Sequence, residues 1–280
     1  MLGLSQAVRQ RFLIPPSQVR SLEPQPFCML NIISNIPEAV KIYKLLNPSG
    51  SEENTSTKFV GGCVRDLILG HKIKDIDLAT SFPPQEIVKI LENENIKTNI
   101  KAINFGVVTA YINNYLFEIT TLRKDLLQDG RYAKIEFIKD WKLDSQRRDF
   151  TINAIYCELN TKSNEGFQLF DPHNGKEDLI NGKIKFIKNA KISIKEDCVR
   201  ALRYLRFFYS YSSYEHDPYV LEQIFKNKDN IKNLSQNRLK TELKKIIVIN
   251  PKLKIEKNSL IKDFFSYIYP DFNSIVNLYY

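Results

Sequence analysis

The sequence predicts an α/β domain that is followed by an all-α domain. From residue 57 to about residue 160, short apolar segments typical of strands alternate with helical spacing and polar turns. From about Ser193 onward, the spacing of the apolar residues is helical. Alternating strands and helices of this length suit a mixed sheet with helices and one active face. We therefore expect the chemistry of the first domain to lie on one face of a sheet.

The individual elements follow from local signals. Asn113-Asn114 is a turn signal between two strands, and Pro83-Pro84 opens a helix because proline is tolerated in the first helical turn. One expected strand ends at Val60, and others cover Val107–Ile112, Leu116–Leu122 and Ile135–Ile138. The expected helices cover Asn31–Asn47, Pro84–Leu91, Ser193–Ser210, Pro218–Phe225 and Ser235–Ile249.

The chain length and these elements predict four segments. At 280 residues, the chain suits one large domain or two modest ones. Arginines and prolines near the start favour a poorly ordered extension over a transit-like leader. The predicted segments are an extension over residues 1–30, a head over 31–160, a helical neck over 161–250 and the start of a truncated body over 251–280.

Composition narrows the class of partner. The net charge of +9 at pH 7 favours an anionic partner. No apolar run reaches the roughly 20 residues of a membrane-spanning helix, so we expect no membrane partner. The four cysteines form no Cys-x-x-Cys motif, which argues against a thiolate zinc site. Unpaired thiols fit a reducing compartment, so we expect a cytoplasmic protein.

The segment from Phe59 to Thr80 carries the strongest chemical signal. An apolar strand ends at Gly61-Gly62 and turns directly into a helix, where backbone N–H groups can approach a phosphate. Asp75 and Asp77 follow two residues apart, so their side chains lie on the same side of a strand. Paired carboxylates of this kind suit Mg²⁺, which completes its coordination with phosphate oxygens. Taken separately, a tight turn and solvated strand-end carboxylates would explain the same residues.

Three further groups of residues carry two interpretations each. Glu118, on a strand, is either an outward-facing residue or a third carboxylate beside the aspartates, able to bind metal or to deprotonate a ribose hydroxyl. Arg147-Arg148-Asp149 is either a solvated helix cap or a phosphate-binding fork. The remaining group has one member at every third position of a predicted helix. It is either an intrahelical ion-pair ladder or a ridge of side chains that binds a ligand. Its members are Asp197, Arg200, Arg203 and Arg206.

Together these motifs resemble a known family. Gly-Gly-x-Val-Arg-Asp from Gly61, the Leu69-Gly70 helix stop and Asp-x-Asp at Asp75 are similar to the head of the class II tRNA nucleotidyltransferase and bacterial poly(A) polymerase family. The resemblance extends from about Phe59 to Ile249 and implies a polymerase-β-like palm followed by an all-α neck. The amino-acid sequence around Asp129-Gly130-Arg131 is most similar to that of alphaproteobacterial and mitochondrial CCA-adding enzymes.

The resemblance implies a reaction and a role for each residue. An RNA 3′-hydroxyl would attack the α-phosphate of CTP or ATP, and pyrophosphate would leave, so that C and A are added to tRNA without a template. Asp75 and Asp77 would hold Mg²⁺, and Gly62 with Arg65 would hold the triphosphate. Arg148 would contact the sugar and phosphates. Asp197 and Arg200 would select the base, and Arg203 and Arg206 would support them.

Other interpretations remain open at this stage. A poly(A) polymerase that acts on general RNA, or an inactive RNA-binding remnant, would carry many of the same motifs. The sequence also departs from the family, because Asn237 occupies the position where a neck motif commonly has glutamate. The chain ends soon after the neck, so we expect a shortened variant, a fragment, or an enzyme that relies on an additional subunit or oligomer.

Overall fold

The computed structural model describes two compact units of the chain. The described residues are 33, 35–48, 56–73, 75–126, 135–160, 166–212, 214–249 and 260–272. They divide after Ile180 into a sheet unit (described residues 33–180) and a helical unit (described residues 181–272). The predicted extension over residues 1–30 and the Asp129-Gly130-Arg131 segment lie outside the described residues. The functional limits of head, neck and body stay predictions.

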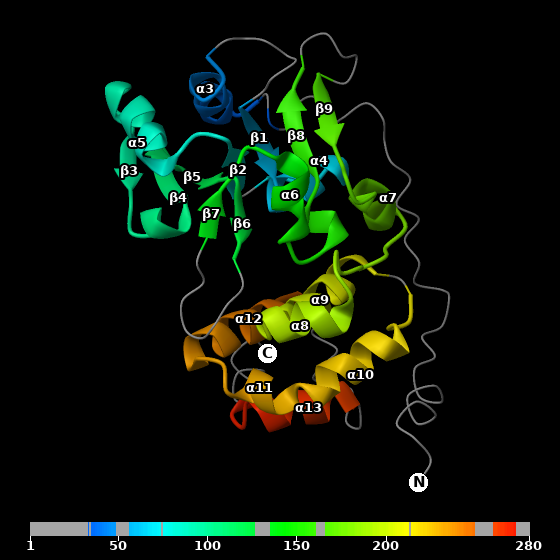
Figure 1. Cartoon of the computed structure of the whole chain (residues 1–280). Coiled ribbons are helices and arrows are strands. Elements are labelled where there is room, and N and C mark those ends of the chain that lie inside the picture. The colour runs from blue at the N-terminus through cyan, green and yellow to red at the C-terminus, as the bar shows by residue number, and fades with distance from the viewer. Residues whose placement is uncertain are drawn as a thin grey trace. The chain divides into compact units, whose positions relative to one another are not determined.

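A mixed sheet forms the centre of the sheet unit (Figure 1). Its strand order is β3-β4-β5-β2-β1-β8-β9, in which β2 and β5 are parallel and the other neighbours antiparallel. The strands are β1 (Thr57–Val60), β2 (Ile76–Thr80), β3 (Lys97–Asn99), β4 (Val107–Ile112), β5 (Tyr115–Thr121), β8 (Tyr156–Leu159) and β9 (Phe167–Phe170). A separate ribbon pairs β6 (Arg123–Asp125) with β7 (Ile135–Phe137).

Helices complete the sheet unit and bury its central strands. Every residue of β1 is buried, and Phe59 and Phe117 are fully inaccessible to solvent, because apolar surface gains stability when it leaves water. The helices are α3 (Pro37–Leu45), α4 (Gly62–Ile68), α5 (Pro84–Asn93), α6 (Trp141–Gln146), α7 (Gly175–Ile180) and the 3₁₀ turns η2 (Ile103–Phe105) and η3 (Thr151–Asn153).

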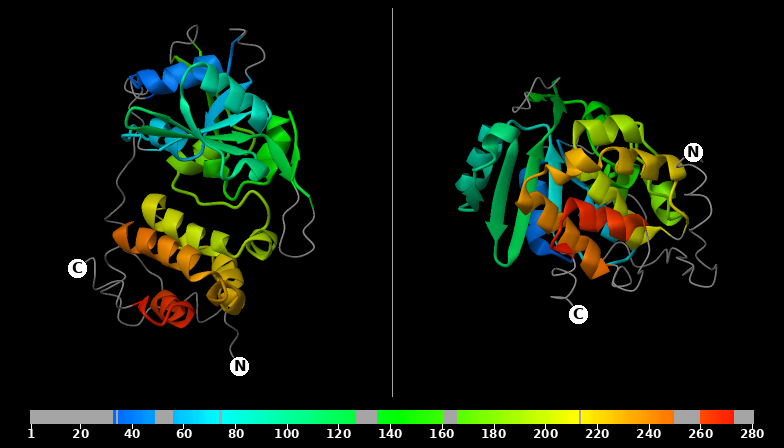
Figure 2. Two further views of the ribbon diagram at one scale, coloured as in Figure 1. Left: turned by 90° about the vertical axis from the view of Figure 1, so that its left-hand side faces the viewer. Right: turned by 90° about the horizontal axis from the view of Figure 1, so that it is seen from below.

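The helical unit has its own aromatic core. Helices α9 and α12 lie side by side in both orientations (Figures 1 and 2). Tyr204 on α9 and Phe265 and Phe272 in the C-terminal part are almost completely buried. The helices are α8 (Ala190–Glu196), α9 (Val199–Tyr211), α10 (Pro218–Lys226), α11 (Lys228–Lys232), α12 (Gln236–Ile249) and α13 (Leu260–Ile268). No helix within the described ranges is both long and apolar enough to cross a bilayer.

The predicted fold class is confirmed: a mixed sheet with helices precedes a helical part. One predicted helix is wrong. The helix expected over Ser193–Ser210 is broken between α8 and α9, where Asp197 has extended dihedrals. At the break, the Asp197 carboxylate accepts a hydrogen bond from the backbone N–H of Val199 (3.2 Å), the first residue of α9, whose N-cap position is Cys198. The four-residue ridge is therefore not carried by one continuous helix.

Candidate functional site

Carboxylates from two strands meet on one face of the sheet. Asp77 on β2 lies in register with Glu118 on the parallel neighbour β5, so the two side chains project to the same side. Asp75 lies in an exposed bend immediately before β2, two residues before Asp77, and not on the strand itself as the spacing predicts. Of the two interpretations of Glu118, the register supports a carboxylate beside Asp77, although the side chain is also exposed.

Electrostatics single out Asp77 in this group. Burial raises the pKa of Asp77 to about 6, and the carboxylates of Glu118 and Asp75 add to the rise. The guanidinium groups of Arg148 and Arg65 act in the opposite direction and lower this pKa. The group therefore holds carboxylate oxygens that repel one another and are only partly neutralised by arginine. Carboxylate oxygens suit a hard divalent cation, which would relieve the repulsion, but as they stand no three metal-ligating side chains among the described residues are placed to hold one together.

The Gly61-Gly62 turn brings the backbone close to these carboxylates. Gly61 has φ +76°, a backbone conformation that side chains disfavour. A Cβ atom at Gly61 would lie 3.4 Å from Oδ2 of Asp77, within van der Waals contact, so the backbone conformation rather than lack of space disfavours a larger residue. Gly62, the predicted triphosphate contact, is the first residue of α4. The conformational demand thus falls on Gly61, which was not among the predicted site residues.

Arg65 is held beside the same turn. One end of its guanidinium, Nη1, donates a hydrogen bond to Oδ1 of Asn153 on η3. The other end, Nη2, lies 3.7 Å from the position that a Cβ atom of Gly62 would occupy. Because a guanidinium is planar and always charged, fixing one nitrogen also fixes the direction of the others. The structure thus places a permanent positive charge at the glycine turn.

Arg148 belongs to a buried network rather than to a solvated cap. Its Nε and Nη2 atoms lie 3.3 and 3.1 Å from Oδ2 of Asp144, and Nε also donates to the Tyr156 hydroxyl at 3.0 Å. Tyr156 donates to the same Oδ2 at 2.7 Å, and Asp144 is fully buried. The solvated-cap interpretation of Arg147-Arg148 is therefore wrong. Tyr156 was missed because it comes from β8 and gives no local signal. Asp144 lies three and four positions before Arg147 and Arg148, so its pairing with them could have been found from that spacing.

The predicted base-selecting residues lie in the helical unit, where Asp197 pairs with an arginine of another helix. Nη2 of Arg238 on α12 lies 3.0 Å from each carboxylate oxygen of Asp197. This partner is forty-one positions away in the sequence, so spacing within α9 could not reveal it. The pairing differs from the intrahelical ladder that was considered for Asp197.

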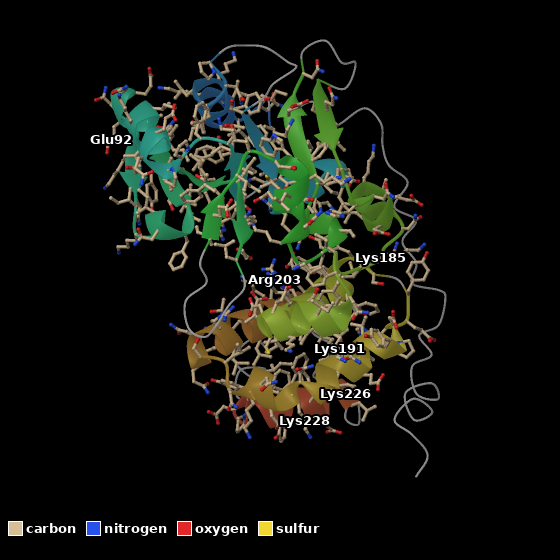
Figure 3. The ribbon with its side chains drawn as sticks, in the orientation of Figure 1. Glu92, Lys185, Lys191, Arg203, Lys226 and Lys228 are labelled. Carbon is tan, nitrogen blue, oxygen red and sulfur yellow. The ribbon has the colours of Figure 1, made fainter. Side chains whose placement is uncertain are left out.

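The three arginines of α9 have separate surroundings. Arg200 donates to Glu196 on α8 at 2.7 Å, and Glu196 also accepts from Lys188. Arg203, labelled in Figure 3, has its guanidinium carbon 5.4 Å from the ring centre of Phe207. The guanidinium carbon of Arg206 lies 4.5 Å from the centre of the same Phe207 ring, and its Nε lies 3.2 Å from Glu242 on α12. Arg203 and Arg206 thus share one aromatic ring, while Arg200 pairs with acid.

Comparisons with known proteins agree with this geometry. A family profile described as "Poly A polymerase head domain" matches residues 57–185, which contain every predicted site residue of the sheet unit. Human CCA tRNA nucleotidyltransferase 1, mitochondrial, is 41% identical over 202 residues, which are 71% of this chain and 45% of the human protein. The chain thus spans less than half the length of this curated relative.

Two solved structures share the fold. The Bacillus stearothermophilus CCA-adding enzyme in complex with CTP matches 80% of this chain and 49% of its own, with a TM-score of 0.61 and 28% identity. The Thermotoga maritima CCA-adding enzyme complexed with tRNA matches 89% of this chain and 56% of its own, with a TM-score of 0.65 and 25% identity. Residues 57–185 thus belong to the poly(A) polymerase head-domain family, and the chain is similar to CCA-adding enzymes over about half of their length.

Proposed function

We propose that this chain adds C and A to the 3′ end of tRNA, from CTP and ATP, with release of pyrophosphate. The observation that carries the proposal is the group of carboxylates from β2 and β5 beside the Gly61-Gly62 turn. Nucleotidyl transfer requires oxygen ligands for a divalent metal next to a place for a triphosphate. The CTP and tRNA complexes of the structural neighbours support the choice of substrates.

Each residue of the sheet unit has a role in this proposal. Asp75 and Asp77 would hold Mg²⁺, which when bound would stabilise charge on the attacking and leaving oxygens. Gly62 and Arg65 hold the triphosphate, and Arg148 positions the sugar and phosphates from its buried network. Glu118, exposed beside Asp77, either accepts the proton of the RNA 3′-hydroxyl or completes the metal ligands.

The helical unit supplies base selection in the same proposal. A carboxylate next to an arginine offers both a hydrogen-bond acceptor and donors to the edge of a base. Asp197 and Arg200 are assigned this role, and Arg203 and Arg206 support them. Arg238 holds the carboxylate of Asp197 and would fix its orientation.

Poly(A) addition to general RNA is the second candidate, because the matching family profile is described by that activity. An inactive RNA-binding remnant is the third. A cytoplasmic location, and the participation of an additional subunit or a second copy, stay predictions from the sequence. The human relative is named as a mitochondrial protein.

Nucleotide incorporation separates these functions. The purified chain is incubated with Mg²⁺, each labelled nucleotide in turn, and either a tRNA that lacks its terminal CCA or an unstructured RNA. We expect C and then A to be added to the tRNA. Addition of A alone to both RNAs would favour the poly(A) polymerase, and no incorporation would leave the remnant.

Variants test the carboxylate assignment. We expect Asp75→Asn and Asp77→Asn each to abolish incorporation while tRNA binding is retained, because metal ligands are lost and RNA contacts are not. Glu118→Gln is expected to slow incorporation about 100-fold or more if it transfers a proton. The matched control is Glu92→Gln on α5, an exposed residue labelled in Figure 3, which should leave the rate unchanged. Incorporation by both aspartate variants at nearly the wild-type rate would overturn the metal assignment.

A further inference from the structure

We propose that Asn153 is a positioning residue that aims the guanidinium of Arg65 at the Gly61-Gly62 turn. The inference rests on the proposed function, because Arg65 is there assigned to the triphosphate of a nucleotide. Asn153 was not among the predicted site residues, and it lies eighty-eight positions after Arg65. Asn153 as a whole residue is only 5% exposed, so a ligand has little access to it. Any effect on the ligand must therefore pass through another group.

The hydrogen bonds of Asn153 allow one orientation of its amide. Oδ1 accepts from Nη1 of Arg65, and Nδ2 donates to Oδ1 of Asp149 at 2.7 Å. A guanidinium only donates hydrogen bonds and an ionised carboxylate only accepts them. Rotating the amide by 180° would set donor against donor at Arg65 and acceptor against acceptor at Asp149. Asp149 thus orders Asn153, and Asn153 in turn orders Arg65.

The 3₁₀ turn that carries Asn153 is itself fixed from its other side. A Cβ atom at Gly175 on α7 would come within 2.1 Å of the carbonyl oxygen of Thr151, so only glycine permits this approach. Thr151 also donates a buried hydrogen bond to Asp178 at 2.9 Å. Asn153 therefore projects from a rigid support, as a residue that orients a charged partner requires.

The consequence for Arg65 is directional. With Nη1 engaged by Asn153, Nη2 is the nitrogen that lies by Gly62. A free arginine side chain on a helix samples several rotamers and loses that entropy when it binds an anion. Asn153 removes part of this cost before a nucleotide arrives. The affinity for the triphosphate should depend on Asn153, and the affinity for the nucleoside should not.

The experiment is a double-mutant cycle on nucleotide affinity in the full chain. Kd values for CTP and for cytidine are measured by calorimetry for the wild type, Asn153→Leu, Arg65→Met and the double variant. We expect Asn153→Leu to weaken CTP binding about tenfold or more, because a hydrogen bond to a charged group is lost. We expect cytidine binding to be unchanged, and Asn153→Leu to have no further effect once Arg65 is methionine.

Controls separate positioning from general destabilisation. Thr57→Val removes a buried hydrogen bond to Thr80 at the opposite end of β1, so it should lower stability without changing the ratio of the CTP and cytidine Kd values. Asn153→Ser serves if the leucine variant does not fold. Nitrogen-15 spectra of the Arg65 guanidinium add a test without nucleotide: distinct Nη signals are expected in the wild type, and averaged signals in Asn153→Ser.

The outcomes are distinguishable. Equal weakening of CTP and cytidine binding, multiplicative losses in the double variant, or unchanged Nη signals would each overturn the positioning role while leaving nucleotide transfer intact. A wild-type chain that binds CTP no more tightly than cytidine would instead contradict the triphosphate site of the proposed function.

Discussion

Two aspartates, Asp144 in the sheet unit and Asp197 in the helical unit, both pair with arginine but differ in exposure to water. The side chain of Asp144 is 0% exposed, and its two arginine partners are each 16% exposed. The side chains of Asp197 and its partner Arg238 are 37% and 52% exposed. The same ion-pair chemistry therefore operates in two different dielectric environments.

Burial changes what such a pair can do. Besides its arginines, Asp144 accepts hydrogen bonds from the Tyr156 hydroxyl and from the backbone N–H of Arg123 at 3.1 Å. A buried charge with this many partners fixes their geometry, and it is costly to disturb. Water screens the exposed pair, which contributes little to stability and can exchange partners readily. The first arrangement suits a rigid scaffold, and the second suits a group that must engage a variable ligand.

The largest expected effect is on the buried pair. Asp144→Asn keeps the shape of the side chain but leaves the charges of Arg147 and Arg148 without their carboxylate. We expect the free energy of unfolding to fall by about 3–5 kcal/mol. Urea unfolding, followed through the fluorescence of Trp141, measures the change in the sheet unit.

The control for this prediction is Asp140→Asn on the same helix. Asp140 is the exposed N-cap of α6 and accepts a hydrogen bond from Leu143 at 3.0 Å. Asparagine caps helices equally well, so stability should change by less than about 0.5 kcal/mol. Similar losses in the two variants would show that burial is not what distinguishes Asp144.

An intermediate effect is expected from acid, which should lower the stability of the helical unit at a higher pH than that of the sheet unit. Burial lowers the pKa of His216 from 6.5 to about 3, where its ring stacks on Phe208 with the centroids 3.5 Å apart. Below pH 6.5 the His216 imidazole binds a proton in the unfolded chain, whereas in the folded chain it stays neutral until the pH approaches 3. Stability of the helical unit is therefore lost as pH falls from 6.5 towards 3, by at most about 1.4 kcal/mol per pH unit.

Asp144 titrates in a lower range. Burial alone would raise its pKa, but the nearby Arg148 and Arg147 hold the pKa below its ordinary value. Its contribution is therefore lost only in stronger acid.

Urea midpoints at pH 7 and pH 4.5, read by circular dichroism, should fall for the wild type and less for His216→Gln. The exposed His71→Gln is the control. An identical fall in all three proteins would contradict the role of His216.

The smallest effect on stability is expected at the exposed pair. Arg238→Gln should lower the free energy of unfolding by less than about 1 kcal/mol, because both partners are solvated. Under the proposed function, it should instead reduce discrimination between CTP and UTP, since the Asp197 carboxylate loses its orientation. Incorporation of each nucleotide into tRNA measures this ratio. A large loss of stability with unchanged selectivity would show that the Asp197–Arg238 pair, like the network of Asp144, has only a structural role.

The sequence alone determined the features that depend on neighbouring residues. The strand alternation of Val107–Ile112, the proline start of α5 and the Gly61-Gly62 turn all follow from backbone preferences over a few positions. The strand that carries Asp77 is likewise a local feature, although Asp75 lies in the bend before it. These features are local, so they can be predicted without knowing what else the segment contacts.

Only the tertiary structure decided which distant groups meet. Glu118 faces Asp77 because two strands pair in one parallel register, and a shift by one residue would move it to the other face. The Arg65–Asn153 and Asp197–Arg238 pairs likewise join residues eighty-eight and forty-one positions apart. Their registers and contacts are set by how the whole core excludes water. No periodicity within a single segment encodes that packing, so these contacts could not be predicted from the segments alone.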